Sequence, residues 1–274
     1  FGFDIEPQTS ESVLKNRFLL NNIAVERLQT ELLGILTGEY AEKLLNEYRD
    51  VIAVLIPEIS ECFDFEQRNI HHCFDVYRHI ARSVGEIAAE PLLRVAMLMH
   101  DIGKPRVMTQ DKNGTRHFKG HQQVSADIAE GVLRRLRFPK AFTDDCLKLI
   151  MYHDVRFNGS KKQVKRVMSQ VGAELMPKLF QVMEADLLAQ SDYLREEKKS
   201  SVETAKKRFE EIIAQNDCFS LKELKINGND LKTIGISEGR QIGSVLSVLL
   251  DEVIDEQIEN KKSALLKRAQ QIIN

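Results

Sequence analysis

The sequence lacks the features that would place it in several large classes of protein. None of its four cysteines (62, 73, 146 and 218) belongs to a CxxC pair, so we expect buried free thiols in a reducing cytosol rather than disulfides. No apolar run approaches the length of a membrane span and no signal peptide opens the chain, which predicts a cytoplasmic protein without a membrane partner. The formal net charge of −2 excludes a generally basic nucleic-acid coat, so any RNA contact would need a local patch.

A convincing β pattern is also lacking, whereas apolar residues recur at helical spacing along most of the chain. The fold class is therefore predicted to be all-α. Residues 102–119 are expected to be a polar loop, and the Asn227–Asp230 stretch a second one. We expect helices over 13–36 with a break at Asn21-Asn22, and over 40–56, 69–89, 92–101, 121–136, 141–154, 161–171, 174–193, 194–215, 240–256 and 260–273.

The most informative stretch is the apolar run Ala96–Met99, which continues directly into His100 and Asp101. Gly103 and the proline at 105 then end the segment, because glycine permits a turn and proline cannot continue a helix. Little of this run can be exposed to water, so it delivers an imidazole and a carboxylate into the interior. A buried carboxylate must be paired or must hold a cation, and the dipeptide therefore predicts partners elsewhere in the chain.

The predicted helix over 69–89 supplies the first of these partners. His79, His72 and Asp75 share one face of that helix because their offsets are three, four and seven residues. An aspartate four residues before a histidine is suited to fix the tautomer of the imidazole, so Asp75 is expected to orient His79. His72 is either a substrate contact or a capped surface residue.

Further imidazoles and carboxylates stand at the ends of helices or inside them. His121 opens the helix after the polar loop, His153 ends the next helix, and Asp186 lies inside the apolar stretch 180–188. Such a set suits a divalent cation, Zn²⁺, Mn²⁺, Co²⁺, Ni²⁺, Fe²⁺ or Mg²⁺, whereas a cysteine-type structural zinc site is disfavoured. One buried histidine or aspartate is more often a core residue with a hydrogen-bond partner than a metal ligand. For the whole set, however, that interpretation would require a separate partner for every residue.

A basic cluster on the predicted helix over 161–171 has two interpretations. Its members Lys161, Lys162, Lys165 and Arg166 occupy one helical face. The default interpretation is a solvated face, and the alternative is a contact with RNA.

The pattern His79, His100-Asp101 and Asp186, with the dipeptide in Leu-Met-His-Asp-Ile-Gly-Lys, resembles the signature of the HD superfamily of metal-dependent phosphohydrolases. This resemblance implies that these four residues hold one divalent ion, with coordination positions left open for water.

The same resemblance gives roles to three further residues. It implies that His121 and His153 hold a second ion, bridged by Asp101, or act as general acid or base. It also implies that Lys104 contacts the scissile phosphate, so Asp101, Lys104, His121 and His153 are the expected catalytic residues.

A second resemblance covers nearly the whole chain. Phe1–Glu6 with Asn22–Leu28 is similar to the neck of bacterial tRNA nucleotidyltransferases and poly(A) polymerases of the class II CCA-adding type. His72–His79 is similar to the HD region of that group, and Ile226–Leu231 with Gly235–Gly243 resembles its C-terminal body. The implied architecture is a helical neck over 1–60, an HD-domain bundle over 61–200 and a helical tail over 201–274.

The catalytic head of that family, with its Gly-Ser signature and paired aspartates, is not found in the sequence. Because the chain also begins with Phe rather than Met, we expect a headless piece of a longer protein that does not transfer nucleotides by itself. The apolar faces of the terminal helices would suit either a homodimer or contact with the head.

Two functions are therefore expected. The first is a metal-dependent phosphohydrolase that uses one or two ions on a phosphomonoester or a 2′,3′-cyclic phosphodiester. The alternative is a tRNA-binding body whose HD site is silent. A signalling HD enzyme unrelated to tRNA is a weaker third interpretation, because neck and tail both resemble the tRNA group.

Overall fold

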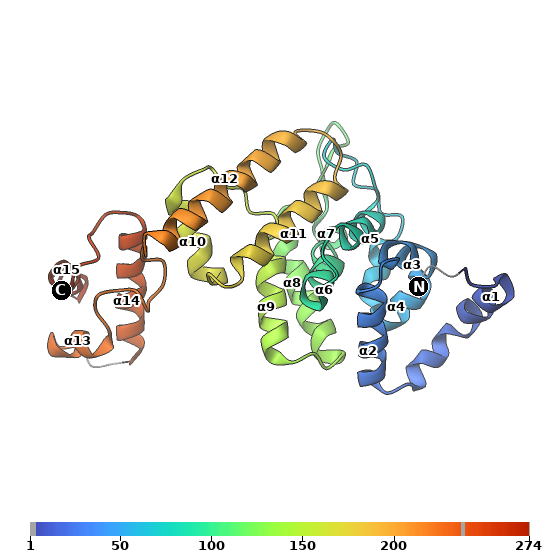
Figure 1. Ribbon diagram of the computed structural model, residues 1–274, viewed down its shortest axis with the longest axis horizontal. Helices are drawn as coiled ribbons and strands as arrows, with labels where there is room; N and C mark the ends of the chain where they lie inside the picture. The colour runs from blue at the N-terminus through green and yellow to red at the C-terminus, as the bar shows by residue number, and fades with distance from the viewer. Residues whose placement is uncertain (1–3, 237–238, 274) are drawn as a thin grey trace. The chain divides into compact units, whose positions relative to one another are not determined.

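The computed structural model describes residues 4–236 and 239–273, and the predicted all-α class is confirmed (Figure 1). Phe1–Phe3 of the expected neck motif and Ser237-Glu238 of the expected tail motif lie outside the described residues. The helices are α1 (Pro7–Asn16), the 3-10 helix η1 (Arg17–Asn22), α2 (Val25–Leu36), α3 (Ala41–Glu47), α4 (Arg49–Leu55), the 3-10 helix η2 (Pro57–Cys62), α5 (Val76–Glu86), α6 (Pro91–Met99), α7 (Lys104–Val107), α8 (His121–Arg135), α9 (Lys140–Tyr152), α10 (Lys161–Val171), α11 (Met176–Ala189), α12 (Arg195–Ala214), α13 (Gly228–Thr233), α14 (Gly239–Ile254) and α15 (Lys262–Ile273).

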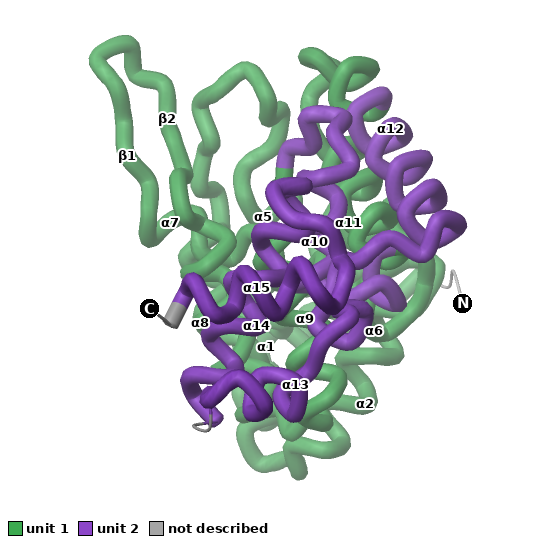
Figure 2. Tube along the Cα trace, turned by 90° about the vertical axis from the view of Figure 1, so that its left-hand side faces the viewer, with its two compact units in different colours: residues 1–155, 177–199 green, residues 156–176, 200–274 purple. Residues whose placement is uncertain are grey.

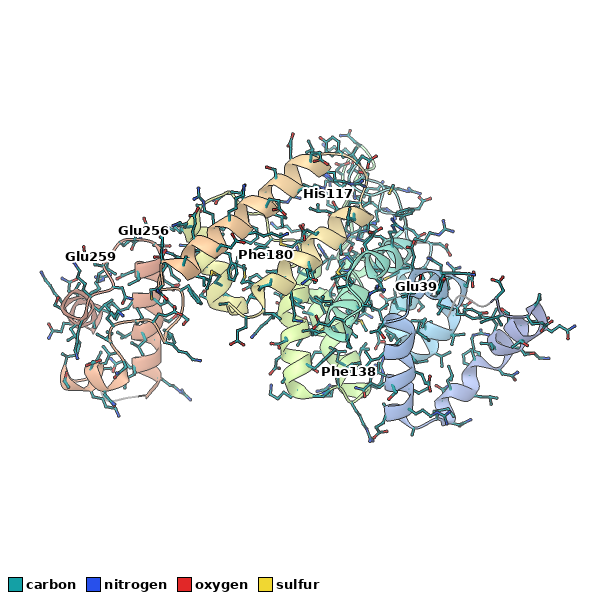
Figure 3. The ribbon with its side chains drawn as sticks, in the orientation of Figure 1. Glu39, His117, Phe138, Phe180, Glu256 and Glu259 are labelled. Carbon is teal, nitrogen blue, oxygen red and sulfur yellow. The ribbon has the colours of Figure 1, made fainter. Side chains whose placement is uncertain are left out.

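The chain forms two compact units, which Figure 2 shows in separate colours. The first unit contains residues 1–155 and 177–199, and the second contains residues 156–176 and 200–274. The segment 1–60, predicted as a neck, thus belongs to the same unit as the helices that follow it. Among the described residues, no helix has both the length and the hydrophobicity needed to cross a bilayer.

The centre of the first unit is α6, whose residues from Leu93 to Met99 are all buried. Pro91 starts this helix, where its missing N–H costs no hydrogen bond. Helices α2, α5, α8 and α9 all contact α6, which explains why a helix that is apolar on every side is stable here (Figure 1). The end of α6 therefore lies inside the protein, and so does the His100-Asp101 dipeptide that follows it.

The helix predicted over 69–89 is shorter in the structure, because α5 begins only at Val76. Asp75 is its N-cap, and the Asp75 carboxylate accepts the backbone N–H of Arg78 at 2.9 Å. The residues before α5 form an irregular segment. The Val76 N–H at the start of α5 donates a hydrogen bond to the Phe65 carbonyl in this segment. His72 and Asp75 are consequently not on the helix that carries His79.

Residues 102–119, predicted as a loop, contain α7 and a small hairpin of β1 (Thr109–Gln110) and β2 (Arg116–His117). The two strands are antiparallel, and in Figure 2 the hairpin extends away from the helices of the first unit. The Asp111 carboxylate closes the turn by accepting the N–H groups of Asn113 and Thr115. Strands of two residues are too short for an alternating pattern to reveal them in a sequence.

The second unit has a core of its own. Its buried residues come from the 218–236 segment and from α14 and α15, and they include Leu231, Leu249 and Leu265. Residues 228–233, expected to be part of a loop, form α13, which a capping box between Asn227 and Asp230 begins.

Candidate functional site

Four of the predicted ligand residues converge in the first unit from three separate parts of the chain. They are His79 on α5, His100 and Asp101 directly after α6, and Asp186 on α11, and all four are buried. One ligand atom from each lies within 4.8 Å of the ligand atoms of the other three. The structure thus brings together the residues that the sequence predicted to share an ion.

The closest atoms of this first group are ring nitrogens and carboxylate oxygens. His79 Nε2 lies 3.1 Å from Asp101 Oδ2 and 3.0 Å from Asp186 Oδ1. His100 Nε2 lies 3.2 Å from Asp101 Oδ2 and 3.6 Å from Asp186 Oδ1. The two Nε2 atoms are themselves only 3.2 Å apart.

A second group of potential ligands shares Asp101 with the first. His121 Nε2 lies 3.1 Å and His153 Nε2 lies 3.7 Å from Asp101 Oδ1, the oxygen that the first group does not use. The Nε2 atoms of these two histidines are 3.2 Å apart. Asp101 therefore presents one oxygen to each group, which is the arrangement that a carboxylate bridging two ions requires.

All four imidazoles are oriented in the same way, with Nδ1 bonded to a backbone carbonyl and Nε2 facing the cluster. The carbonyl partners and distances are Ala189 for His79 at 3.2 Å, Met97 for His100 at 2.7 Å, Phe118 for His121 at 2.8 Å and Ile150 for His153 at 2.7 Å. A neutral imidazole that donates from Nδ1 has a lone pair at Nε2, so two such nitrogens 3.2 Å apart repel one another. A cation between them removes this repulsion.

The acids of the cluster also fit a divalent ion. Both carboxylate oxygens of Asp101 are buried; Oδ2 lies 2.6 Å from the Lys104 ammonium and Oδ1 lies 3.1 Å from His121 Nε2. Imidazole nitrogens together with carboxylate oxygens form a donor set typical of Mn²⁺, Fe²⁺, Co²⁺, Ni²⁺ or Zn²⁺ sites. The residues present therefore could hold one ion in each group.

Without a cation, protons compensate the charge of the carboxylates. Burial lowers the pKa of His100, but the charges of Asp101 and Asp186 outweigh burial and raise that pKa to about 10. Burial raises the pKa of Asp101, but His100 and Lys104 hold it well below its usual value. His153 differs, because burial and the neighbouring imidazoles lower its pKa to about 3 and leave it neutral.

The orientation of Asp186 depends on two residues, Gln190 and Lys198, that the sequence analysis did not predict. Gln190 donates from Nε2 to Asp186 Oδ2 at 2.7 Å, so that Oδ1 faces the imidazoles. The Lys198 ammonium donates to Gln190 Oε1 at 2.6 Å and fixes the direction of the amide. The spacing of four residues between Asp186, near the end of α11, and Gln190, directly after that helix, was the available signal.

Lys104, predicted to contact a phosphate, is buried beside the first group. Its ammonium is 2.6 Å from Asp101 Oδ2 and donates to Gln67 Oε1 at 2.9 Å, and His72 Nε2 lies 3.5 Å away. Burial and the charge of Lys104 lower the pKa of His72 to about 2, so this imidazole is neutral. Gln67 lies in the irregular segment before α5, where no periodicity could have identified it.

Asp75 does not have the predicted role beside His79. Its carboxylate caps α5 through Arg78, and the carbonyl of Ala189 fixes the tautomer of His79 instead. Because α5 begins one residue after Asp75, the helical spacing that motivated the prediction does not apply.

Gly103 allows the second group to form. A Cβ atom at this position would lie 2.6 Å from the Ser125 nitrogen and 3.0 Å from the His121 carbonyl oxygen, both in the first turns of α8. The Gly103 N–H donates to Ser125 Oγ at 2.9 Å. This close approach of two backbones places His121 beside Asp101.

The predicted basic cluster lies on α10 in the second unit, and each of its members is paired with an acid. Lys161 lies 3.2 Å from Glu211, and Lys165 lies 2.8 Å from Asp217. Asp255 pairs with Lys162 at 3.1 Å and with Arg166 at 2.6 Å. These ion pairs connect α10 to α12, to the segment after α12 and to the residue directly after α14, and much of the positive charge of the cluster is compensated inside the unit.

Comparison with known proteins identifies the family. The family described as "tRNA nucleotidyltransferase domain 2 putative" matches residues 120–269, more than half of the chain. The chain belongs to the tRNA nucleotidyltransferase family. Residues 2–63 of this family member also match the "Probable RNA and SrmB- binding site of polymerase A".

Several curated nucleotidyltransferases are similar to the chain. It is 28% identical to the A-adding tRNA nucleotidyltransferase of Deinococcus radiodurans over 271 residues, which cover 91% of this chain and 60% of that protein. It is 28% identical to the CC-adding tRNA nucleotidyltransferase of Thermus thermophilus over 277 residues, covering 96% of this chain and 62% of that one. A multifunctional CCA protein of Pseudomonas fluorescens is 29% identical over 160 residues, 56% of this chain and 38% of the relative. The chain thus spans about 60% of the length of the first two relatives.

Substitution of Gly103 tests the close contact behind the second group. We expect Gly103→Ala to lower the free energy of unfolding by about 1–3 kcal/mol, because the added methyl group meets the backbone of α8. Chemical denaturation measures this change. Gly131→Ala is the matched control, since a Cβ there meets nothing within 4 Å, and equal stability of the two variants would contradict the proposed role.

Metal binding by the cluster is expected to depend on pH. The metal-free protein carries a proton on His100, whose pKa is raised to about 10, and a cation must displace that proton to bind the nitrogen. The Mn²⁺ association constant should therefore rise with pH below about pH 10. Calorimetric titration in buffers of different ionisation enthalpy counts the released protons, and an affinity independent of pH would refute the assignment.

Proposed function

We propose that the chain is the tRNA-binding body of a cytoplasmic CCA-adding-type nucleotidyltransferase and does not transfer nucleotides alone. The observation that carries this proposal is the match of residues 2–63 to an RNA-binding region, at the opposite end of the chain from most of the nucleotidyltransferase match. The two bacterial relatives that align with more than 90% of the chain are both named tRNA nucleotidyltransferases.

The segment that matches the RNA-binding region offers groups for both backbone and base contacts. Lys15 and Arg27 are exposed, and neither has an acidic partner among the described residues. Phe18 and Leu19 are 60% and 61% exposed, and the Arg17 guanidinium lies 4.5 Å from the centroid of the Phe18 ring. Free cations bind phosphates and exposed rings stack on unpaired bases, so both kinds of group suit tRNA.

Salt-dependent tRNA binding tests this proposal. We expect the chain to bind tRNA with an affinity that falls as salt rises, and Lys15→Ala combined with Arg27→Ala should reduce the slope of log K against log salt by about 2. Fluorescence anisotropy with labelled tRNA gives the slope. Lys43→Ala is the control, because Lys43 is already paired with Asp4 at 3.4 Å. Asp101→Ala should bind tRNA as the unsubstituted chain does, and a chain with no affinity for tRNA would overturn the proposal.

A second candidate function is a metal-dependent phosphohydrolase of the HD type, and the two ligand groups that share Asp101 favour it. A divalent ion in such a site supplies Lewis acidity and lowers the pKa of a water ligand. The residues of the chain have separate tasks. Lys104 carries positive charge for a phosphate, and His72 lines the same side of the cluster. His121 and His153 hold a further ion or transfer a proton at Nε2.

Phosphate release with a panel of metals tests the second function. With Ni²⁺, Co²⁺, Mn²⁺ or Mg²⁺, we expect hydrolysis of glycerol phosphate or a nucleoside 2′,3′-cyclic phosphate. Asp101→Ala should lower the rate by more than about 100-fold, because loss of even an outer partner of a ligand costs up to that much. Asp145→Ala on the surface of α9 is the matched control. Absence of metal-dependent turnover on every substrate would exclude this function and would leave tRNA binding unaffected.

A further inference from the structure

Two short segments beside the metal-ligand cluster expose several large apolar side chains. One is the irregular segment before α5, and the other is the end of α11 with the turn that follows. We call their exposed large hydrophobic residues the apolar rim: Ile70, Phe74, Leu188, Tyr193 and Leu194, with exposed fractions of 62%, 39%, 48%, 46% and 40%. Exposed apolar residues that gather near a polar site commonly mark a binding surface.

Direct contacts connect the two segments. The Ser191 N–H donates to the His71 carbonyl at 2.9 Å, and the Ser191 hydroxyl donates to the Ile70 carbonyl at 2.6 Å. The rings of His71 and Tyr193 meet edge to face with centroids 5.2 Å apart. Tyr193 therefore lies beside the Ile70 segment.

The same segments also hold ligand residues of the first group. The Ala189 carbonyl accepts from His79 Nδ1, and the Gln190 amide donates to Asp186. On the other segment, the ring of His72 contacts the ring of His79 with centroids 5.1 Å apart. The apolar rim is thus continuous along the chain with the residues that would hold an ion and a phosphate.

The turn that carries Tyr193 is held in one conformation. Leu194 has a φ of 54°, a left-handed value that a leucine adopts only when its surroundings impose it. The Arg195 guanidinium donates to the Gln190 carbonyl at 2.7 Å, and the Arg195 N–H donates to the Asp192 carbonyl at 3.2 Å. A strained turn stabilised in this way presents Tyr193 as part of a preformed surface.

The chemistry of the cluster and of the apolar rim indicates what kind of ligand would cover both. A nucleotide joins a phosphate to a base, and the faces of bases stack on aromatic and apolar side chains without hydrogen-bond donors. The cluster and Lys104 are suited to the phosphate, and the apolar rim is suited to the base. A sugar phosphate lacks any group that could cover the rim.

We propose that the apolar rim binds the base of a nucleotide phosphoester whose phosphate lies at the metal-ligand cluster, and that Tyr193 is the stacking residue. This inference rests on the second proposed function, because that function places the phosphate at the cluster. The nucleotide is either free or the terminal residue of an RNA, since both present the same base and phosphate.

Binding measurements on the full chain test the role of Tyr193. At a fixed concentration of Mn²⁺, calorimetry compares adenosine 3′-monophosphate with ribose 5-phosphate. We expect the nucleotide to bind about tenfold more tightly, the gain typical of one stacked base. Tyr193→Ala should remove this preference, whereas Tyr193→Phe should retain it because the ring remains. Tyr40→Ala, which changes another exposed tyrosine of the first unit, should also retain it.

Equal affinity for the two ligands, no binding of either, or an unchanged preference in Tyr193→Ala would each overturn the proposal. Such results are expected if the apolar rim meets another protein instead of a base. Hydrolysis of glycerol phosphate without any preference for nucleotides would refute the base site and leave the phosphohydrolase standing. Binding of the nucleotide through Tyr193 without hydrolysis would refute the phosphohydrolase alone. An oligoribonucleotide with a 3′-phosphate distinguishes the two sources, because binding tighter than that of the mononucleotide identifies an RNA end only if Tyr193→Ala removes the gain.

Discussion

The hydrogen bonds from four imidazole Nδ1 atoms to backbone carbonyls are the interaction on which the candidate site depends. Each bond fixes the orientation of a ring and turns Nε2 toward Asp101 or Asp186. Three of the carbonyls lie three residues before their histidine, at Met97, Phe118 and Ile150, so these bonds are local. The fourth, from His79 to Ala189, connects α5 to the end of α11 and therefore depends on the tertiary structure.

Concentrating these groups in the interior is costly unless a cation or protons compensate the charge. Asp101 and Asp186 are both buried, and the pKa of each lies well below its usual value because of the neighbouring positive charges. A core built only for stability would place apolar residues here. The buried imidazoles and carboxylates around α6 are therefore a set of potential cation ligands, and the close contact at Gly103 brings the second group of potential ligands beside the first.

The basic residues of α10 and two basic residues of the segment that matches an RNA-binding region differ in whether they have acidic partners. On α10 of the second unit, the basic residues are used to connect helices through Glu211, Asp217 and Asp255. In the segment that matches an RNA-binding region, Lys15 and Arg27 have no such partner among the described residues. A net charge of −2 is compatible with tRNA binding when the free positive charges are local in this way.

The sequence by itself determined the all-α class, most of the helices and the identity of the clustered residues. It could do so because burial forces ionisable groups such as His100, Asp101 and Asp186 to find partners, and apolar periodicity shows where burial occurs. The sequence did not predict that Asp75 caps α5, so that the helix does not include His72. It also did not predict the hairpin, whose strands are too short to show a period.

Only the tertiary structure decided which carbonyl orients His79, that Gln67 holds Lys104, and how the chain divides into two units. These features join residues that are far apart in the chain or lie in irregular segments. No local propensity encodes such contacts, because they arise only when separate helices pack against one another.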